Sequence, residues 1–251
     1  MVHLRPLPGA PLFGGSLADV IDAALADARA VAAGGADGML FENFGDRPFV
    51  KNRVGAETVA AMTRVIAEVI AEVKMPFGVN VLRNDARAAV AIAAATGAAF
   101  VRINIHTGAM LTDQGLIEGE AAETMRLRAA LAPGLLVFAD HMVKHAVTPA
   151  PVDEIRSARD LRLRGLADAI IVDGAETGQP ADPDRLRAIR EALPHVPLII
   201  GSGLTPENAA SYADADGAIA GTSIKERGEV EAPVDRDRVA RLAATFKFDA
   251  Q

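Results

Sequence analysis

The chain contains no cysteine and no tryptophan, and it has one tyrosine. The lack of cysteine excludes disulfides, thiolate nucleophiles and cysteine-bound metals. Lysine and arginine form no run and the formal net charge is -7, so nucleic acid is not expected as a partner. No segment approaches the ~18 consecutive apolar residues of a membrane-spanning helix, and residues 1–20 lack a signal-peptide pattern. We expect a cytoplasmic protein without an integral membrane segment, which leaves peripheral contact with a membrane open.

What the sequence does contain is a regular alternation of predicted strands and helices. Eight such pairs over 251 residues give about 31 residues per pair, the usual length of a β/α unit. Alternating elements imply parallel strands joined by right-handed crossovers. We therefore predict a single α/β domain over residues 1–251, a (β/α)8 TIM barrel. A doubly wound open sheet is the alternative, but its glycine-rich turn should follow the first strand, where Pro8-Gly9-Ala10-Pro11 stands.

Local signals place several element boundaries. The first strand is predicted over residues 2–7, and Ser16 with Asp19 resembles a capping box that begins the first helix. Asn84 is predicted to cap the third helix. The glycine-rich segment 106–119 is expected to be a long loop and a candidate lid, as is segment 42–53.

The stretch from residue 197 to residue 225 organises our interpretation of function. A buried run at 198–200 is followed by Gly201-Ser202-Gly203, and a helix is predicted to begin with Thr205 as its cap. A second small strand is followed by Gly221 and Thr222. Two adjacent turns with exposed N–H groups, one beginning a helix, favour a phosphate site. Loops after strands 7 and 8 of a barrel frequently bind phosphate. The alternative is that these glycines only permit tight turns.

Polar residues interrupt strands that should be apolar. Arg102, Asn104 and His106 alternate with apolar residues, which predicts that all three point into the barrel. The same reasoning applies to His3, Arg5 and Asn80. Glu42, Asp140 and Asp173 each end a strand, at the edge where barrel enzymes place their chemistry. A structural network, pairing Arg5 with Glu42 and Arg102 with Asp140, is the alternative.

The segment 139–145 has the densest cluster of reactive side chains. Asp140 and His141 are candidate acid and base. Lys144 could form an imine if desolvated, and otherwise serves as a cation facing a substrate anion. No metal-ligand spacing such as HExxH is present, so no metal is predicted and no cofactor is indicated. A homo-oligomer is expected only because many barrels associate.

Seven segments spread over nearly the whole chain stand out together: HLRPLPGAP, ADGMLFENFGDRPF, GVNVLRND, FVRINIHTGAMLTDQGLIEG, FADHMVKHA, GSGLTPEN and GAIAGTSIK. In combination they resemble the BtpA family, which includes SgcQ-like proteins. This resemblance implies a barrel similar to ribulose-phosphate-binding enzymes, whose phosphate sites correspond in kind to Gly201-Ser202-Gly203 and Gly221-Thr222. It also implies two kinds of role: photosystem I biogenesis with peripheral membrane attachment, or sugar and nucleoside metabolism.

The sequence therefore leaves two hypotheses about function. The first is an enzyme acting on a small phosphorylated metabolite, a sugar phosphate or a nucleotide-like compound. Glu42, Asp140, His141 and Lys144 would carry its chemistry, while His3, Asn80, Arg102, Asn104 and Asp173 would bind substrate. Isomerisation, carbon–carbon cleavage and glycosidic cleavage all fit such a site. The second function is a non-catalytic biogenesis or stability factor for a membrane complex such as a photosystem.

Overall fold

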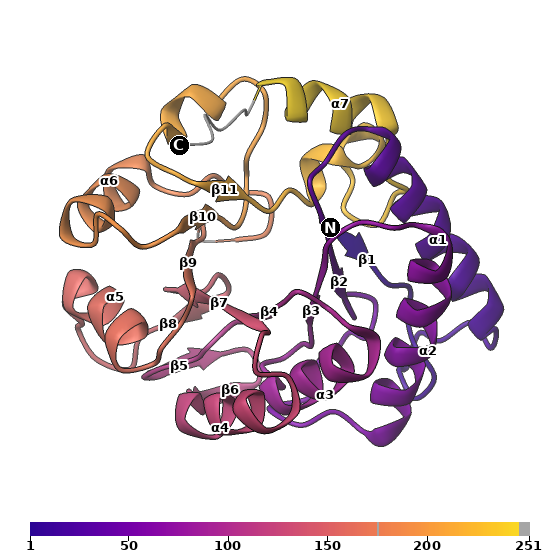
Figure 1. The fold of residues 1–251 in the computed structure, drawn as a ribbon, viewed down its shortest axis with the longest axis horizontal. Helices are drawn as coiled ribbons and strands as arrows, with labels where there is room; N and C mark the ends of the chain where they lie inside the picture. The colour runs from indigo at the N-terminus through magenta and orange to yellow at the C-terminus, as the bar shows by residue number, and fades with distance from the viewer. Residues whose placement is uncertain (175, 246–251) are drawn as a thin grey trace.

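Eight strands with parallel pairing form the central sheet of the computed structural model, which describes residues 1–174 and 176–245. The strands follow the order β1-β2-β3-β4-β7-β9-β10-β11 and curl into a ring (Figure 1). Within the described residues no ladder joins β11 to β1, but the Met1 nitrogen donates to the Ala220 carbonyl at 2.8 Å. The strands are β1 (Val2–His3), β2 (Met39–Glu42), β3 (Phe77–Asn80), β4 (Phe100–Ile103), β7 (Leu136–His141), β9 (Ala169–Val172), β10 (Leu198–Ile200) and β11 (Gly217–Ala218).

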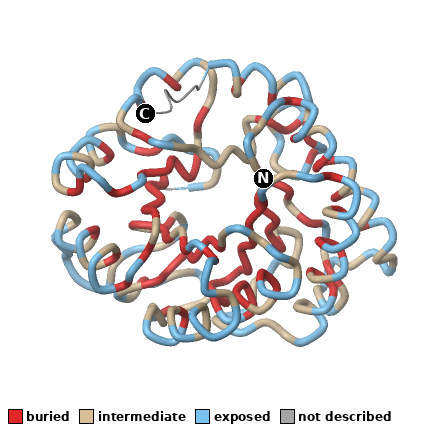
Figure 2. The backbone as a smooth tube through the Cα atoms, viewed as in Figure 1, coloured by how far each residue is buried: buried red, intermediate tan, exposed pale blue. Residues whose placement is uncertain are grey.

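Helices surround this ring and bury one face each against the strands. Figure 2 shows the buried residues concentrated on the strands and on the inner sides of the helices. The predicted cap Ser16 accepts a bond from the backbone N–H of Asp19, and Asp153 accepts from Arg156 N–H in the same way at the start of a later helix. The helices are α1 (Leu17–Ala33), α2 (Ala56–Glu72), α3 (Ala86–Thr96), α4 (Ala121–Leu131), α5 (Glu154–Leu163), α6 (Pro183–Ala192) and α7 (Arg236–Thr245). The predicted eight-unit barrel architecture is confirmed, with one exception.

The exception is the helix predicted to begin at Thr205. Only the 3-10 helix η1 (Ala209–Tyr212) lies between β10 and β11. Asn208 explains the difference, because its side chain accepts from Thr205 N–H at 2.8 Å and donates to the Gly203 carbonyl at 2.8 Å. Such side-chain bonds to nearby backbone compete with helix formation. The helix dipole expected to face the Gly201-Ser202-Gly203 turn is therefore absent from this connection.

Three further boundaries differ from the predictions. The first strand ends at His3 because Pro6 cannot extend a ladder, and Leu7 N–H turns to bond Asp46 at 2.8 Å. Asp85, not Asn84, caps α3, since Asn84 bonds to Ile105 instead. Segment 106–119 is a hairpin rather than a loop: β5 (Ala109–Thr112) pairs antiparallel with β6 (Gly115–Glu118) and with β8 (Ala146–Val147).

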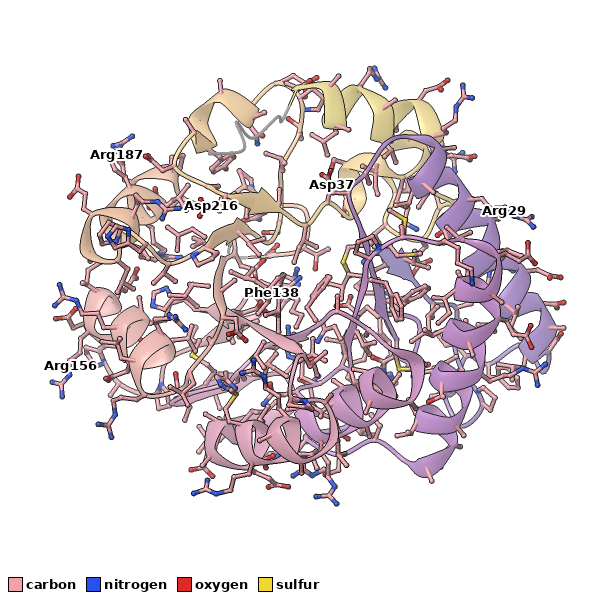
Figure 3. The ribbon with its side chains drawn as sticks, in the orientation of Figure 1. Arg29, Asp37, Phe138, Arg156, Arg187 and Asp216 are labelled. Atoms are coloured by element: carbon pink, nitrogen blue, oxygen red, sulfur yellow. The ribbon has the colours of Figure 1, made fainter. Side chains whose placement is uncertain are left out.

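The inside of the ring is apolar below the cavity described next. Phe138 of β7 points into this interior and stacks on Phe100, with ring centroids 4.6 Å apart. Figure 3 shows Phe138 near the centre of the ring, while Arg29, Arg156 and Arg187 lie on the outer helices. The polar side chains at the carboxyl end of β4 therefore lie above the stacked rings of Phe100 and Phe138.

Candidate functional site

A cavity of about 810 Å³ opens at the carboxyl ends of the parallel strands. It brings together most of the side chains and turns that the sequence predicted. Of the described residues that line it, basic side chains outnumber acidic ones. The predicted residues in its lining are His3, Glu42, Arg102, Asn104, Lys144, Gly201, Ser202, Gly203, Gly221 and Thr222.

Arg102 is the centre of a buried network. It is 2% exposed, and its Nε donates to Asp140 Oδ1 at 2.8 Å. Its Nη2 donates to Asp140 Oδ2 at 3.1 Å and to Asp173 Oδ2 at 2.8 Å. Asp140 and Asp173 lie outside the cavity lining. The Arg102–Asp140 ion pair, which the sequence offered as a structural alternative, is thus present.

Burial and charge within this network shift the pKa values of Asp140 and Asp173 in opposite directions. Burial, with the negative charge of Asp173, raises the pKa of Asp140 to about 6 despite Arg102. Burial would also raise the pKa of Asp173, but the positive charges of Arg102 and Lys144 outweigh it and lower that pKa. Lys144 Nζ lies 3.8 Å from Asp173 Oδ1, an atom that accepts no hydrogen bond from the described residues. Lys144 Nζ therefore lies close to a carboxylate of the protein itself.

Two asparagines fix the orientation of the network. Asn80 Nδ2 donates to the Arg102 carbonyl at 3.0 Å and to Asn104 Oδ1 at 3.2 Å. Asn104 Nδ2 in turn donates to Asp140 Oδ2 at 2.9 Å. Asn104 reaches the cavity lining and Asn80 does not. Asn80 therefore contacts Asn104 and does not reach the cavity lining, and its role in binding substrate stays a prediction.

Glu42 is the carboxylate of the β2 end that lines the cavity. His3 Nε2 lies 3.7 Å from Glu42 Oε1, and the His3 ring stacks on Phe44 with centroids 4.5 Å apart. Burial and nearby positive charge, including that of Lys225, hold the pKa of His3 well below its usual range. A neutral imidazole therefore faces Glu42. The alternative pair of Arg5 with Glu42 is wrong, because Arg5 is exposed beyond the end of β1.

Asp140 and His141 are adjacent on β7 but point to opposite faces of the strand, and neither lines the cavity. Successive residues of a strand point to opposite faces, so His141 packs outside the barrel near Glu154. Burial, with the positive charge of Arg185, lowers the pKa of His141 to about 4. His106 was expected to point into the barrel, but β4 ends at Ile103 and His106 Nε2 lies 2.8 Å from the Gly165 carbonyl oxygen. The His106 ring is thus held by a backbone carbonyl, whereas neither ring nitrogen of His141 has a hydrogen-bond partner among the described residues.

The glycine turns of the predicted phosphate site lie side by side in the cavity. A Cβ on Gly201 would lie 2.4 Å from Asp173 Oδ1, and one on Gly203 would lie 2.3 Å from the Gln179 backbone. Ser202 Oγ accepts from Gly174 N–H at 2.8 Å and donates to the Gln179 carbonyl at 3.0 Å. Close packing therefore explains the glycines at 201 and 203. The Gly221 turn faces His3, since a Cβ added to Gly221 would lie 3.3 Å from His3 Cε1.

Residues near these turns escaped prediction. Arg238 and Arg241 of α7 line the cavity beside Ser223, whose carbonyl accepts from Arg238 Nη1 at 3.1 Å. Their spacing of three residues puts them on one helix face, a signal that could have been found after the last strand. Arg83, in the loop that follows β3, also lines the cavity.

Neither a metal site nor a membrane segment emerges from the described residues. Within 1–174 and 176–245, no three His, Asp or Glu side chains are grouped to hold a metal ion. No helix in those ranges has the length and apolar character needed to cross a membrane.

Comparison with known proteins agrees with the sequence segments. The model of the BtpA family matches residues 1–247. The chain belongs to the BtpA family. It is 43% identical over 241 residues to the photosystem I biogenesis protein BtpA of Synechocystis sp., covering 96% of this chain and 84% of that protein. It is 34% identical over 246 residues to the sgc region protein SgcQ of Escherichia coli, covering 96% and 91% of the two chains.

Solved structures similar to this BtpA-family protein are barrel enzymes. A phosphoribosyl anthranilate isomerase from Thermococcus kodakaraensis matches with a TM-score of 0.54 at 17% identity, over 88% of this chain and 93% of that one. A dihydropteroate synthase from Xanthomonas albilineans matches with a TM-score of 0.58 at 14% identity, over 98% and 87%. At these identities the likeness establishes the TIM-barrel fold alone.

Proposed function

We propose that this BtpA-family protein is an enzyme that acts on a small phosphorylated metabolite, a sugar phosphate or a nucleotide-like compound. The observation that carries the proposal is the cavity at the carboxyl ends of the strands, which combines two glycine turns and arginines with a set of buried ionisable groups. A similar fold binds a deoxyribulose 5-phosphate in one phosphoribosyl anthranilate isomerase. Phosphorylated substrates are thus compatible with this architecture.

The phosphate would bind between the turns that follow β10 and β11. Gly201, Ser202 and Gly203 form one wall, and Gly221 with Thr222 forms the other. Because no α-helix begins at either turn, the positive charge must come from elsewhere. Arg238 and Arg241 of α7 supply it at this end of the cavity.

Proton transfer is assigned to Glu42, since it is the predicted catalytic carboxylate that reaches the cavity. Neutral His3 would orient it. Arg102, Asn104 and Lys144 would stabilise negative charge that develops on the substrate. Asp140 and Asp173 would hold Arg102 in place from below. This chemistry is shared by isomerisation, carbon–carbon cleavage and glycosidic cleavage.

A second function is favoured by a relative alone. The Synechocystis protein named for photosystem I biogenesis is 43% identical to this chain. A non-catalytic factor would tolerate alanine at Glu42 and Lys144 without loss of its role. An enzyme would not.

The phosphate site can be tested by thermal-shift measurements with inorganic phosphate, sugar phosphates and nucleotides. A ligand at a hundred times its Kd should add about 2.7 kcal/mol to stability. Arg241→Glu, at an exposed position of α7, should abolish the shift by placing a carboxylate beside the phosphate. Arg236→Glu is the matched control on the same helix, because Arg236 does not line the cavity. A lack of response to every compound, or equal responses from both variants, would contradict the proposal.

A further inference from the structure

Arg83 is a buried cation in the cavity without a carboxylate partner among the described residues. It is 5% exposed and lines the cavity. Its Nη2 donates to the Lys144 carbonyl at 2.8 Å, while its Nε is buried and bonds to no described residue. A buried donor without a hydrogen-bond partner lowers the stability of the folded state. An acceptor from outside the described chain would remove that cost.

The backbone on both sides of Arg83 is clamped by buried asparagines. Asn43 Oδ1 accepts from Leu82 N–H at 2.7 Å, and Asn43 Nδ2 donates to the Leu82 carbonyl at 3.3 Å. Asn84 Oδ1 accepts from Ile105 N–H at 2.7 Å, and its Nδ2 donates to the Ile105 carbonyl at 3.0 Å. Four side-chain bonds thus fix a single short loop. Such support is typical of a side chain held ready for a ligand.

The neighbouring arginine provides a contrast. Arg102 is paired with both Asp140 and Asp173, so its charge is satisfied inside the protein. Asp140, Asp113 and Glu42 are the acidic groups whose charges act on Arg83 from the surrounding elements, and Arg102 opposes them. None of the three forms an ion pair with Arg83. Of the two buried arginines that line the cavity, Arg102 is paired with carboxylates of the protein, and Arg83 can still bind an anion.

Strand order places Arg83 across the barrel from the phosphate turns. In the eight-stranded ring β3 is third and β10 is seventh, so the loops that follow them rise from opposite walls. Figure 1 shows β3 and β10 on opposite sides of the ring. A ligand anchored at Gly203 and Arg241 would extend across the cavity toward Arg83.

We propose that Arg83 binds a second anionic group of the substrate, a carboxylate or a second phosphate. The substrate is then a phosphorylated compound with an oxyanion at its other end. The planar guanidinium fork matches the oxygen pair of either group. This inference rests on the proposed function and defines the substrate class more narrowly.

The test compares ligands with one and with two anionic groups. Fructose 1,6-bisphosphate and 6-phosphogluconate carry two, whereas fructose 6-phosphate and glucose 6-phosphate carry one. Binding is measured by titration calorimetry at fixed ionic strength on the full chain. The wild type should bind the better of the two ligands with two anionic groups at least about tenfold more tightly than its counterpart with one anionic group. Arg83→Gln should remove that preference and leave the Kd of the single-anion ligands within about twofold.

Arg87→Gln is the matched control, since Arg87 is exposed on α3 and contacts Glu123. It should keep the wild-type preference. Should Arg83→Gln fail to fold, Arg83→Lys replaces it and should lower the preference by losing the fork.

Each outcome bears on a different claim. Equal binding of both ligand classes by the wild type, or an unchanged preference in the Arg83 variant, would overturn the role of Arg83 alone. A lack of binding by all four compounds would count against the proposed function itself.

Discussion

Adjacent residues on β7 serve different parts of the molecule, as Asp140 and His141 show. Asp140 supports Arg102 beneath the cavity, whereas His141 packs near α5. Strand alternation correctly predicted the direction of Arg102, and Asn104, the first residue after β4, still follows it. The same rule separates His141 from Asp140, and their position at a strand end obscured it. For His106 alternation did not apply, because the strand had already ended.

His141 should make folding stability depend on pH. Its folded pKa of about 4 lies below its ordinary value of 6.5, so the unfolded chain takes up a proton first as pH falls. The stability is fully present above pH 6.5 and is lost toward pH 4, by about 3 kcal/mol. Urea unfolding of the wild type and of His141→Gln should show a smaller loss in the variant over this range.

The raised pKa of Asp140 acts in the opposite direction, since ionisation above about pH 6 costs the folded state. The wild type and His141→Gln both contain Asp140, so comparing their stabilities at each pH removes this contribution. His195→Gln, at an exposed position, should follow the wild-type profile. Parallel profiles for the wild type and His141→Gln would show that the ring is not buried in its neutral form.

At the scale of elements, the sequence predicted which helices and strands exist better than it predicted the residues at which they begin and end. The predicted cap Ser16 does begin α1, whereas the predicted cap of α3 was one residue away from Asp85. The hairpin of β5 and β6 was missed because its third strand, β8, is two residues long and lies distant in sequence. The missing helix after β10 depends on Asn208, whose side chain takes over the backbone bonds of that turn.

The segment after β11 depends on one buried ion pair with α1. Lys225 Nζ lies 2.7 Å from Asp27 Oδ2, and Asp27 Oδ1 accepts from Val234 N–H at 2.8 Å. This segment includes Arg227 and Gly228 of the cavity lining. The segment that follows β11 is therefore held against the first helix by these contacts.

Lys225→Met should destabilise the protein by about 3 to 5 kcal/mol, because it leaves the Asp27 carboxylate buried and unpaired. The double variant Asp27→Asn with Lys225→Met should recover most of that loss, since the amide oxygen can still accept from Val234. Denaturant midpoints measure both effects. If the single variant lies within about 1 kcal/mol of the wild type, the pair is not closed in solution.

At the scale of the molecule, the barrel and the side of the sheet that carries the site were predictable. The alternation of strands and helices predicted the barrel, and the polar residues at the strand ends predicted which end of the barrel carries the site. The arrangement inside the cavity was not predictable, because it depends on pairings between strands distant in sequence. Arg102 with Asp173 and Lys225 with Asp27 are examples.

We predict that the whole chain unfolds as a single cooperative unit. The main hydrophobic core is continuous from Val2 of β1 to Leu242 of α7, so no described segment holds a separate core of comparable extent. Calorimetric and van't Hoff enthalpies should agree, and circular dichroism should give the same midpoint. Two separable transitions would show that the chain contains more than one domain.

The cavity takes His3 from one end of the chain and Arg241 from the other. His3 is therefore synthesised long before Arg241. A nascent chain that stops before α7 lacks Arg238 and Arg241, which we propose as the cations of the phosphate site, however well its early strands have paired. Retention on an immobilised phosphate resin should accordingly require α7, and fragments that stop before this helix should not be retained.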